Sequence, residues 1–200
     1  MNSWRFASNC IVLALLSLLF SISQSLGEAG SSYENRGQEK LDKGEYPRNP
    51  DEVVKAYCSA DLRGDGWSSD SWKNLHQYTL WEDAPGWDTA VIISSFDAHS
   101  IRTNSEKSDV RVVYRILGRQ SGDDFTEKRY SETRIYHLQK QNGRWKIREP
   151  QLPPHISTGT AINHLEKLRS NPENGERLAN INKSINLLKK LESVSHRSSS

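Results

Sequence analysis

The sequence has few of the residues that would support a disulfide framework. It contains only two cysteines and one methionine in 200 residues. Cys10 lies inside a predicted export signal, so only Cys58 remains in the mature chain and no intrachain disulfide can form. The fold must therefore be held by its hydrophobic core, which a chain of this length can build as a single domain.

An excess of charge of one sign is also missing. The chain has 27 Lys and Arg against 25 Asp and Glu, a net charge of +2 with neutral histidines. Arg5 is the only charged residue of the predicted signal, so cleavage leaves a mature chain of net charge +1. Nucleic-acid-binding domains carry a strongly basic stripe or patch, so we expect no nucleic-acid partner.

The strong catalytic and metal-binding motifs are absent. There is no Gly-rich phosphate loop, His-Glu-x-x-His, Cys-x-x-Cys or Gly-x-Ser-x-Gly. The nearest histidine pair, His155 and His164, lacks the spacing of two metal ligands on one helix, and both are expected at the surface. We therefore predict no metal and no cofactor, and we interpret Cys58 as a small core residue.

The N-terminus has the pattern of an export signal. Arg5 precedes an apolar run over residues 11–22, and small residues follow up to Gly27. The run is shorter than the roughly 20 apolar residues of a membrane span and suits a signal peptide. We predict cleavage near Gly27 and a secreted or periplasmic protein that meets the membrane only through this signal. An uncleaved anchor is the alternative.

Composition divides the rest of the chain. Residues 28–49 are polar and are predicted to form a flexible linker. The main domain is expected at residues 50–168, followed by an amphipathic helix at 169–192 and a disordered tail at 193–200. The apolar stripe of that last helix could dock on the sheet or on a second copy of the chain, which would give a homodimer.

Local signals predict two helices before a sheet. Asn49 is a suitable N-cap, Pro50 suits a first helical turn, and apolar residues recur at helical spacing up to Arg63-Gly64, which should end the helix. A shorter helix is expected at residues 69–78.

The sheet is predicted as a meander that follows these helices. The four expected strands cover residues 89–101, 110–117, 133–138 and 145–147. Ser94-Ser95 interrupts the alternation of the first strand and indicates a β-bulge, and Asn142-Gly143 is a strong hairpin signal. Residues 118–128 are expected to form a charged, mobile hairpin tip, and the prolines of residues 150–154 should end the sheet.

This order of elements resembles the NTF2-like superfamily, which includes SnoaL-like and ketosteroid isomerase-like proteins. The resemblance covers residues 50–168 and implies an α+β fold, with a bent, mostly antiparallel sheet wrapped around the N-terminal helices as a cone and C-terminal helices added. The segment 81–88, with its two tryptophans and Pro85-Gly86 turn, and the Pro-Gln-Leu-Pro-Pro run at 150–154 are similar to uncharacterised exported bacterial members.

The resemblance implies a cavity but no particular activity. We expect a non-catalytic module that binds a small apolar ligand or a partner protein at the open end of the cone. The candidate lining residues are Tyr57, Trp81, Trp87, Tyr114 and Arg134. The segment 81–88 could instead be a rigid plug that closes one end of the fold.

The alternative is an enzyme of lyase or isomerase type. In the helix at residues 53–57 that resembles ketosteroid isomerase, Tyr57 would donate a hydrogen bond and Asp83, before Pro85, would act as the base. The protonated acid that completes that enzyme's site falls here at Arg134 or Ile135, neither of which can act as a neutral acid donor. For catalysis, the Asp83 carboxylate and the Tyr57 hydroxyl would have to meet in one cavity.

Overall fold

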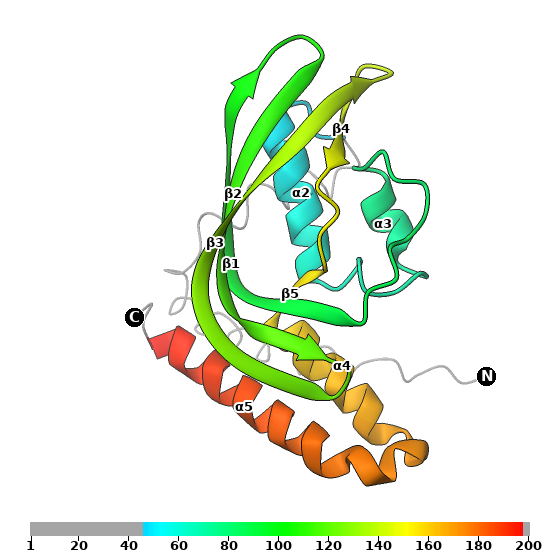
Figure 1. Ribbon diagram of the computed structural model, residues 1–200, viewed down its shortest axis with the longest axis vertical. Coiled ribbons are helices and arrows are strands. Elements are labelled where there is room, and N and C mark those ends of the chain that lie inside the picture. Colours follow the sequence, from blue (N-terminus) through cyan, green and yellow to red (C-terminus); the bar gives the residue numbers. More distant parts are fainter. Residues whose placement is uncertain (1–45, 198–200) are drawn as a thin grey trace, which may run out of the picture. The chain divides into compact units, whose positions relative to one another are not determined.

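The computed structural model describes residues 46–197, which belong to one compact unit. The predicted signal peptide, almost all of the predicted linker and residues 198–200 lie outside the described residues. The described part is an α+β fold in which helices pack on a curled, five-stranded mixed sheet (Figure 1).

The element order matches the predicted helix–helix–sheet–helix arrangement. The helices are α2 (Pro50–Leu62), α3 (Trp72–His76), α4 (Thr158–Ser170), a 3-10 helix η1 (Pro172–Arg177) and α5 (Leu178–Arg197). The strands are β1 (Thr89–Thr103), β2 (Lys107–Ser121), β3 (Asp124–Gln141), β4 (Arg144–Glu149) and β5 (His155–Ser157).

The sheet has the strand order β4-β3-β2-β1-β5. The pairs from β1 to β4 are antiparallel, whereas β5 runs parallel to β1 through the partners Val91 and His155. The mostly antiparallel meander was predicted. The parallel β5 was not, because the chain returns to the far edge of the sheet only after the proline-rich segment that was expected to end it.

Helix α2 forms where the capping signals predicted it. Asn49 has an extended backbone, Pro50 occupies the first turn, and Asp51 and Glu52 favour the positive end of the helix dipole. Gly64 follows the helix with φ +89°, a conformation in which a side chain would be strained. The helix packs on one face of the sheet, which we call the inner face (Figure 1).

Strand β1 carries a bulge, and its side chains contribute to two cores because successive residues of a strand point to opposite faces. The register shifts on both sides of Ile93, next to the predicted Ser94-Ser95 interruption. Val91 and Ile93 pack in the core under α2, whereas Ala90 and Ile92 pack in a second core with α4 and α5. The second core includes Ile181, Ile185 and Leu188 of α5, so this helix packs within the fold, which is one of the two alternatives left open by the sequence.

Two segments that were expected to be irregular form regular secondary structure. Residues 118–128 are not a mobile tip, because β2 continues to Ser121 and β3 begins at Asp124 around a turn at Gly122. Helix α5 continues to Arg197, so the tail predicted from residue 193 is helical over its described part. The Asn142-Gly143 turn is confirmed, with positive φ at both residues.

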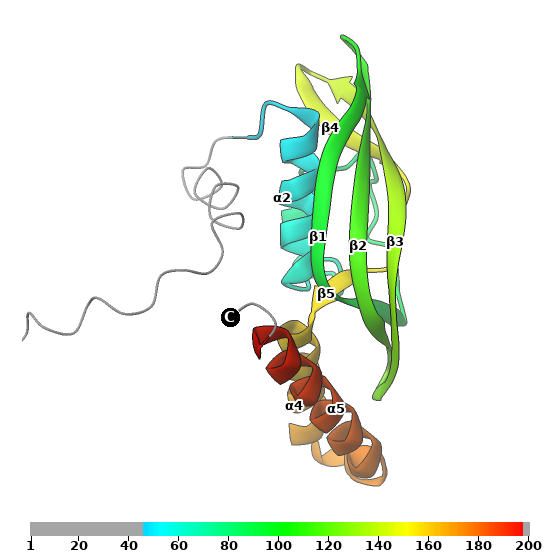
Figure 2. The same ribbon diagram turned by 90° about the vertical axis from the view of Figure 1, so that its left-hand side faces the viewer.

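The face of β1, β2 and β3 opposite α2 is called the outer face. Figure 2 looks onto it, and no helix crosses the upper halves of these strands. None of the helices within residues 46–197 has both the length and the apolar character needed to cross a membrane.

Candidate functional site

The predicted lining residues divide into a buried and an accessible group. Tyr57, Trp81 and Tyr114 are 4%, 9% and 1% exposed. The Tyr57 ring packs edge-on against Trp81 with centroids 6.1 Å apart. Trp87 is half-buried and Arg134 is exposed in an ion pair with Glu132. The buried three are core residues packed among other side chains, and they do not form an open surface with the other two.

The catalytic alternative required Asp83 and Tyr57 to meet in one cavity. Asp83 is exposed to solvent, whereas Tyr57 is buried against Trp81 and Tyr136. A carboxylate in water and a phenol in the core do not share a site for one small substrate. The structure therefore does not bring Asp83 and Tyr57 together as an acid–base pair.

The inner face instead holds a buried chain of hydroxyl and thiol groups. The Tyr114 and Tyr136 hydroxyls are 2.7 Å apart, and the Cys58 sulfur lies 3.3 Å from the Tyr114 hydroxyl. Burial raises the pKa of the Cys58 thiol to about 12, so the sulfur is not a thiolate at neutral pH. Cys58 is a core residue, as predicted, and its partner there is a tyrosine.

Asp61 and His155 extend this buried polar group. The Asp61 carboxyl accepts a 2.7 Å hydrogen bond from the His155 backbone N–H, and burial raises its pKa to about 8. His155 is buried, not at the surface as predicted, and its ring stacks on Tyr114 at 4.1 Å. Burial lowers the pKa of His155 to about 4, although the Pro153 carbonyl favours the protonated ring. Neither ring nitrogen meets a partner in hydrogen-bonding geometry.

This buried group contains residue types that are common in functional sites, but it is not accessible from solvent. Its members are almost fully buried, and the two cavities described below lie elsewhere. Within residues 46–197, no three His, Cys, Asp or Glu side chains are grouped so that they could hold a metal ion. We therefore assign Asp61 and His155 to the stability of the fold.

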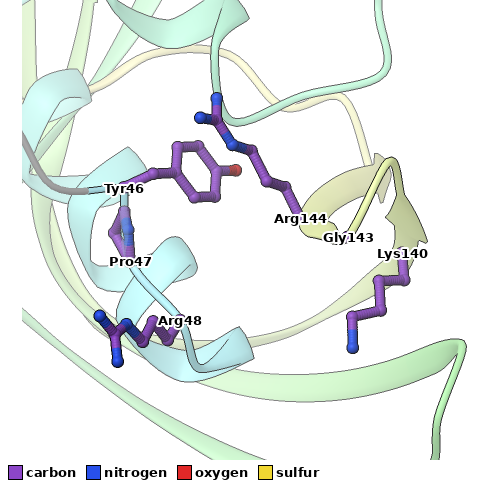
Figure 3. A pocket seen from close by; sticks show the side chains of 6 residues that line it. All are labelled: Tyr46, Pro47, Arg48, Lys140, Gly143 and Arg144. Carbon is purple, nitrogen blue, oxygen red and sulfur yellow. The ribbon is translucent and has the colours of Figure 1, made fainter.

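An accessible cavity of about 300 Å³, which we call the Tyr46 pocket, lies between the start of α2 and the β3–β4 hairpin. Figure 3 shows its lining: Tyr46, Pro47, Arg48, Lys140, Gly143 and Arg144. No acidic residue lines it.

The hydroxyl and the ring of Tyr46 both hold this side chain in the pocket. Its hydroxyl donates a 2.5 Å hydrogen bond to the Trp145 carbonyl, and its ring packs against Tyr78 with centroids 5.9 Å apart. Tyr46 and the three residues after it were predicted to belong to a flexible linker. The structure corrects this, because Tyr46 packs on the main core and orders the approach to α2.

Cations gather around the Tyr46 ring. The Arg144 guanidinium lies 5.0 Å and the Lys146 ammonium 5.7 Å from the ring centroid, both within cation–π range. Lys140 contacts the neighbouring Trp145 ring at 5.4 Å. Within the described residues, neither Arg144 nor Lys140 forms an ion pair with a carboxylate. Partial burial and the nearby Arg144 lower the pKa of Lys146, which reflects the cost of crowding positive charge here.

The sequence contained part of this signal. Asn142-Gly143 predicted the turn that projects Arg144, and the Lys140, Arg144 and Lys146 spacing was readable along the hairpin. Tyr46 could not be added from the pattern, because it lies 99 residues from the carbonyl to which it bonds.

Comparison with known proteins adds no functional information. No protein-family model matches the chain, and no curated protein matches it. Among solved structures, it is similar to the solution structure of a SEC-C motif containing protein from Rhodopseudomonas palustris. The two share 13% identity over 62% of this chain and 94% of that chain, with a TM-score of 0.30. A similarity of this size carries no argument about fold or function.

Proposed function

We propose that this chain is an exported, non-catalytic binding module of NTF2-like type whose ligand or partner carries negative charge. This proposal rests on the Tyr46 pocket, an accessible cavity that is lined by cationic side chains and by no carboxylate. The ligand class is a small polycarboxylate or an acidic protein segment.

The electrostatics of the pocket favour such a ligand. Arg48, Lys140 and Arg144 line the pocket with positive charge, which an anion bound there would offset. A guanidinium can also donate two parallel hydrogen bonds to one carboxylate. An apolar ligand would instead remove these charges from water without compensation, which costs free energy. The expected apolar character of the ligand is thus not favoured at this pocket.

The NTF2-like assignment rests on the element order and on α2 against the inner face of a bent sheet with a bulged first strand. Export rests on Arg5, the apolar run over residues 11–22 and the small residues up to Gly27. The residues predicted to form a catalytic pair do not form an accessible pair of groups, and a binding role agrees with this arrangement.

Titration with defined anions tests the proposal. Citrate and an oligoglutamate peptide would be titrated into the protein at low salt, with binding heats measured by calorimetry. Arg144→Gln should weaken binding about tenfold or more, because a hydrogen bond to a charged group contributes about 1.5–3 kcal/mol. Lys140→Gln should weaken it in the same direction.

Lys183→Gln is the matched control. Lys183 is an exposed lysine on α5, so this variant removes the same unit of charge outside the pocket. If Lys183→Gln weakens binding as much as Arg144→Gln, the interaction reports only net charge and the proposed pocket is wrong.

A further inference from the structure

A second cavity of about 300 Å³ lies at the end of the sheet formed by the β1–β2 hairpin and does not share a residue with the Tyr46 pocket. Its lining residues are Arg102, Asn104, Lys107, Ser108, Asp109, His137, Leu138, Gln139 and Arg148. We call it the His137 pocket. Three cationic side chains and one histidine line it against a single carboxylate.

That carboxylate is already occupied. Asp109 accepts hydrogen bonds from Arg102 Nη2 at 2.6 Å and Nε at 3.1 Å, and its other oxygen lies 2.8 Å from His137 Nδ1. Its side chain is 15% exposed, and the hydrogen bonds from His137 and Arg102 lower its pKa. An ionised carboxylate only accepts hydrogen bonds, so His137 Nδ1 carries a proton. Asp109 therefore orients Arg102 and fixes the tautomer of His137.

Asn104 is oriented as a donor. The Asn104 side-chain oxygen accepts from the backbone N–H groups of Glu106 and Lys107, which leaves its NH₂ group as the free end. Lys107 is exposed and forms no ion pair with any described residue. Arg148 pairs with the exposed Glu149.

We propose that the His137 pocket binds a tetrahedral oxyanion, the charged group of a phosphate or sulfate ester, and that protonation of His137 strengthens this binding. Donors that approach from β1, β2, β3 and β4 suit a tetrahedral group, whose oxygens point in several directions, better than a planar carboxylate. A volume near the lower end of the range for ligand pockets fits a small ester.

The histidine supplies the pH dependence. With Nδ1–H bound to Asp109, a neutral ring offers a lone pair at Nε2, which repels an anion. Proton uptake turns Nε2 into a charged donor while the Asp109 contact is kept. The charged groups that face the ring are Asp109 and Lys107 on β2, Arg102 on β1, and Arg148 and Glu149 on β4. Glu149, which pairs with His137 in the sheet register, opposes anion binding.

Sulfate is the probe for the pH test, because it stays dianionic across the range, whereas a phosphate ester gains a proton near pH 6. Binding should be tighter at about pH 5.5 than at about pH 8. His137→Gln should remove this dependence, and Lys107→Gln should weaken binding at both pH values. At pH 8, O-phosphoserine and inorganic phosphate then distinguish an ester from the free ion, and citrate tests a carboxylate ligand.

His99→Gln is the matched control. His99 Nε2 lies 2.8 Å from Asp97 in an exposed pair on the same strand as Arg102, but it lines neither described pocket. It should leave the pH dependence intact. Equal pH dependence in wild type and His137→Gln would overturn the proposal, as would tighter binding of citrate than of phosphate ester when both are measured in the Arg144→Gln variant, whose Tyr46 pocket is impaired. Neither result would bear on the Tyr46 pocket.

Discussion

Asp61 should make the stability of the fold fall as the pH rises through neutrality. The carboxyl is buried in α2, and burial raises its pKa to about 8. In the unfolded chain an aspartate ionises near pH 4. Between these values the folded protein holds a proton that the unfolded chain has lost, so a rising pH favours unfolding.

His155 acts in the opposite direction at lower pH. Its folded pKa of about 4 lies below the ordinary histidine value of 6.5, so a falling pH favours the unfolded state between these values. From about pH 4 to 6.5 the contributions of Asp61 and His155 oppose each other. From pH 6.5 to 8, Asp61 is the one of these two groups whose protonation differs between the folded and the unfolded state. One proton changes the free energy of unfolding by about 1.4 kcal/mol per pH unit, so this free energy should fall by about 2 kcal/mol over that range.

Asp61→Asn isolates this effect. The variant keeps an oxygen that can accept the His155 N–H hydrogen bond but cannot ionise. Urea unfolding, followed by tryptophan fluorescence at pH 6.5, 7.2 and 8 in wild type and variant, gives the difference between the two pH slopes. Asp83→Asn, at an exposed carboxyl, should follow wild type. Parallel curves for wild type and Asp61→Asn would refute a protonated Asp61 in the folded protein.

Three further substitutions and one control substitution test the packing by urea unfolding. Gly118→Ala should lower the free energy of unfolding by about 1–3 kcal/mol, because the added Cβ would lie 2.3 Å from the Thr126 carbonyl oxygen. Gly86→Ala is the control: its Cβ would meet no atom within 4 Å, so the substitution should be nearly neutral. Leu188→Ala should cost about 2–5 kcal/mol, since the side chain is fully buried in the second core; a cost below 1 kcal/mol would mean that α5 is not docked as described. Tyr46→Phe should cost about 1 kcal/mol through loss of the bond to the Trp145 carbonyl, and no cost would contradict that contact.

Features set by neighbouring residues were predictable from the sequence. Asn49-Pro50 placed the start of α2, and Asn142-Gly143 placed the β3–β4 turn. The interruption at Ser94-Ser95 indicated the bulge in β1. In each case the deciding interaction is made within a few residues, so the local pattern carries the information.

Features set by distant contacts were not predictable. The polar turn between β2 and β3 is ordered by Ser184 of α5, whose hydroxyl accepts from the Phe125 N–H at 2.9 Å and donates to the Asp123 carbonyl at 2.8 Å. His155 is buried because β5 pairs with β1 and brings its ring onto Tyr114. No pattern within either segment reveals its partner.

The same distinction applies to the candidate site. Aromatic residues were expected to line a cavity, but Tyr57, Trp81 and Tyr114 are the side chains that fill the core under α2. The Tyr46 pocket joins the segment before α2 to a hairpin almost 100 residues later in the chain. Its cations were visible in the sequence, and their arrangement around one ring was not.

Mapping of backbone amide shifts by NMR during a citrate titration tests whether the Tyr46 pocket binds an anion. An anion in the Tyr46 pocket should shift the amides of Arg48, Gly143 and Arg144 most strongly, with saturation, and in Arg144→Gln the same shifts should require about tenfold more citrate or more. Shifts that are absent at these three amides, or that are spread over the exposed lysines of α5 without saturation, would contradict the assignment of the pocket.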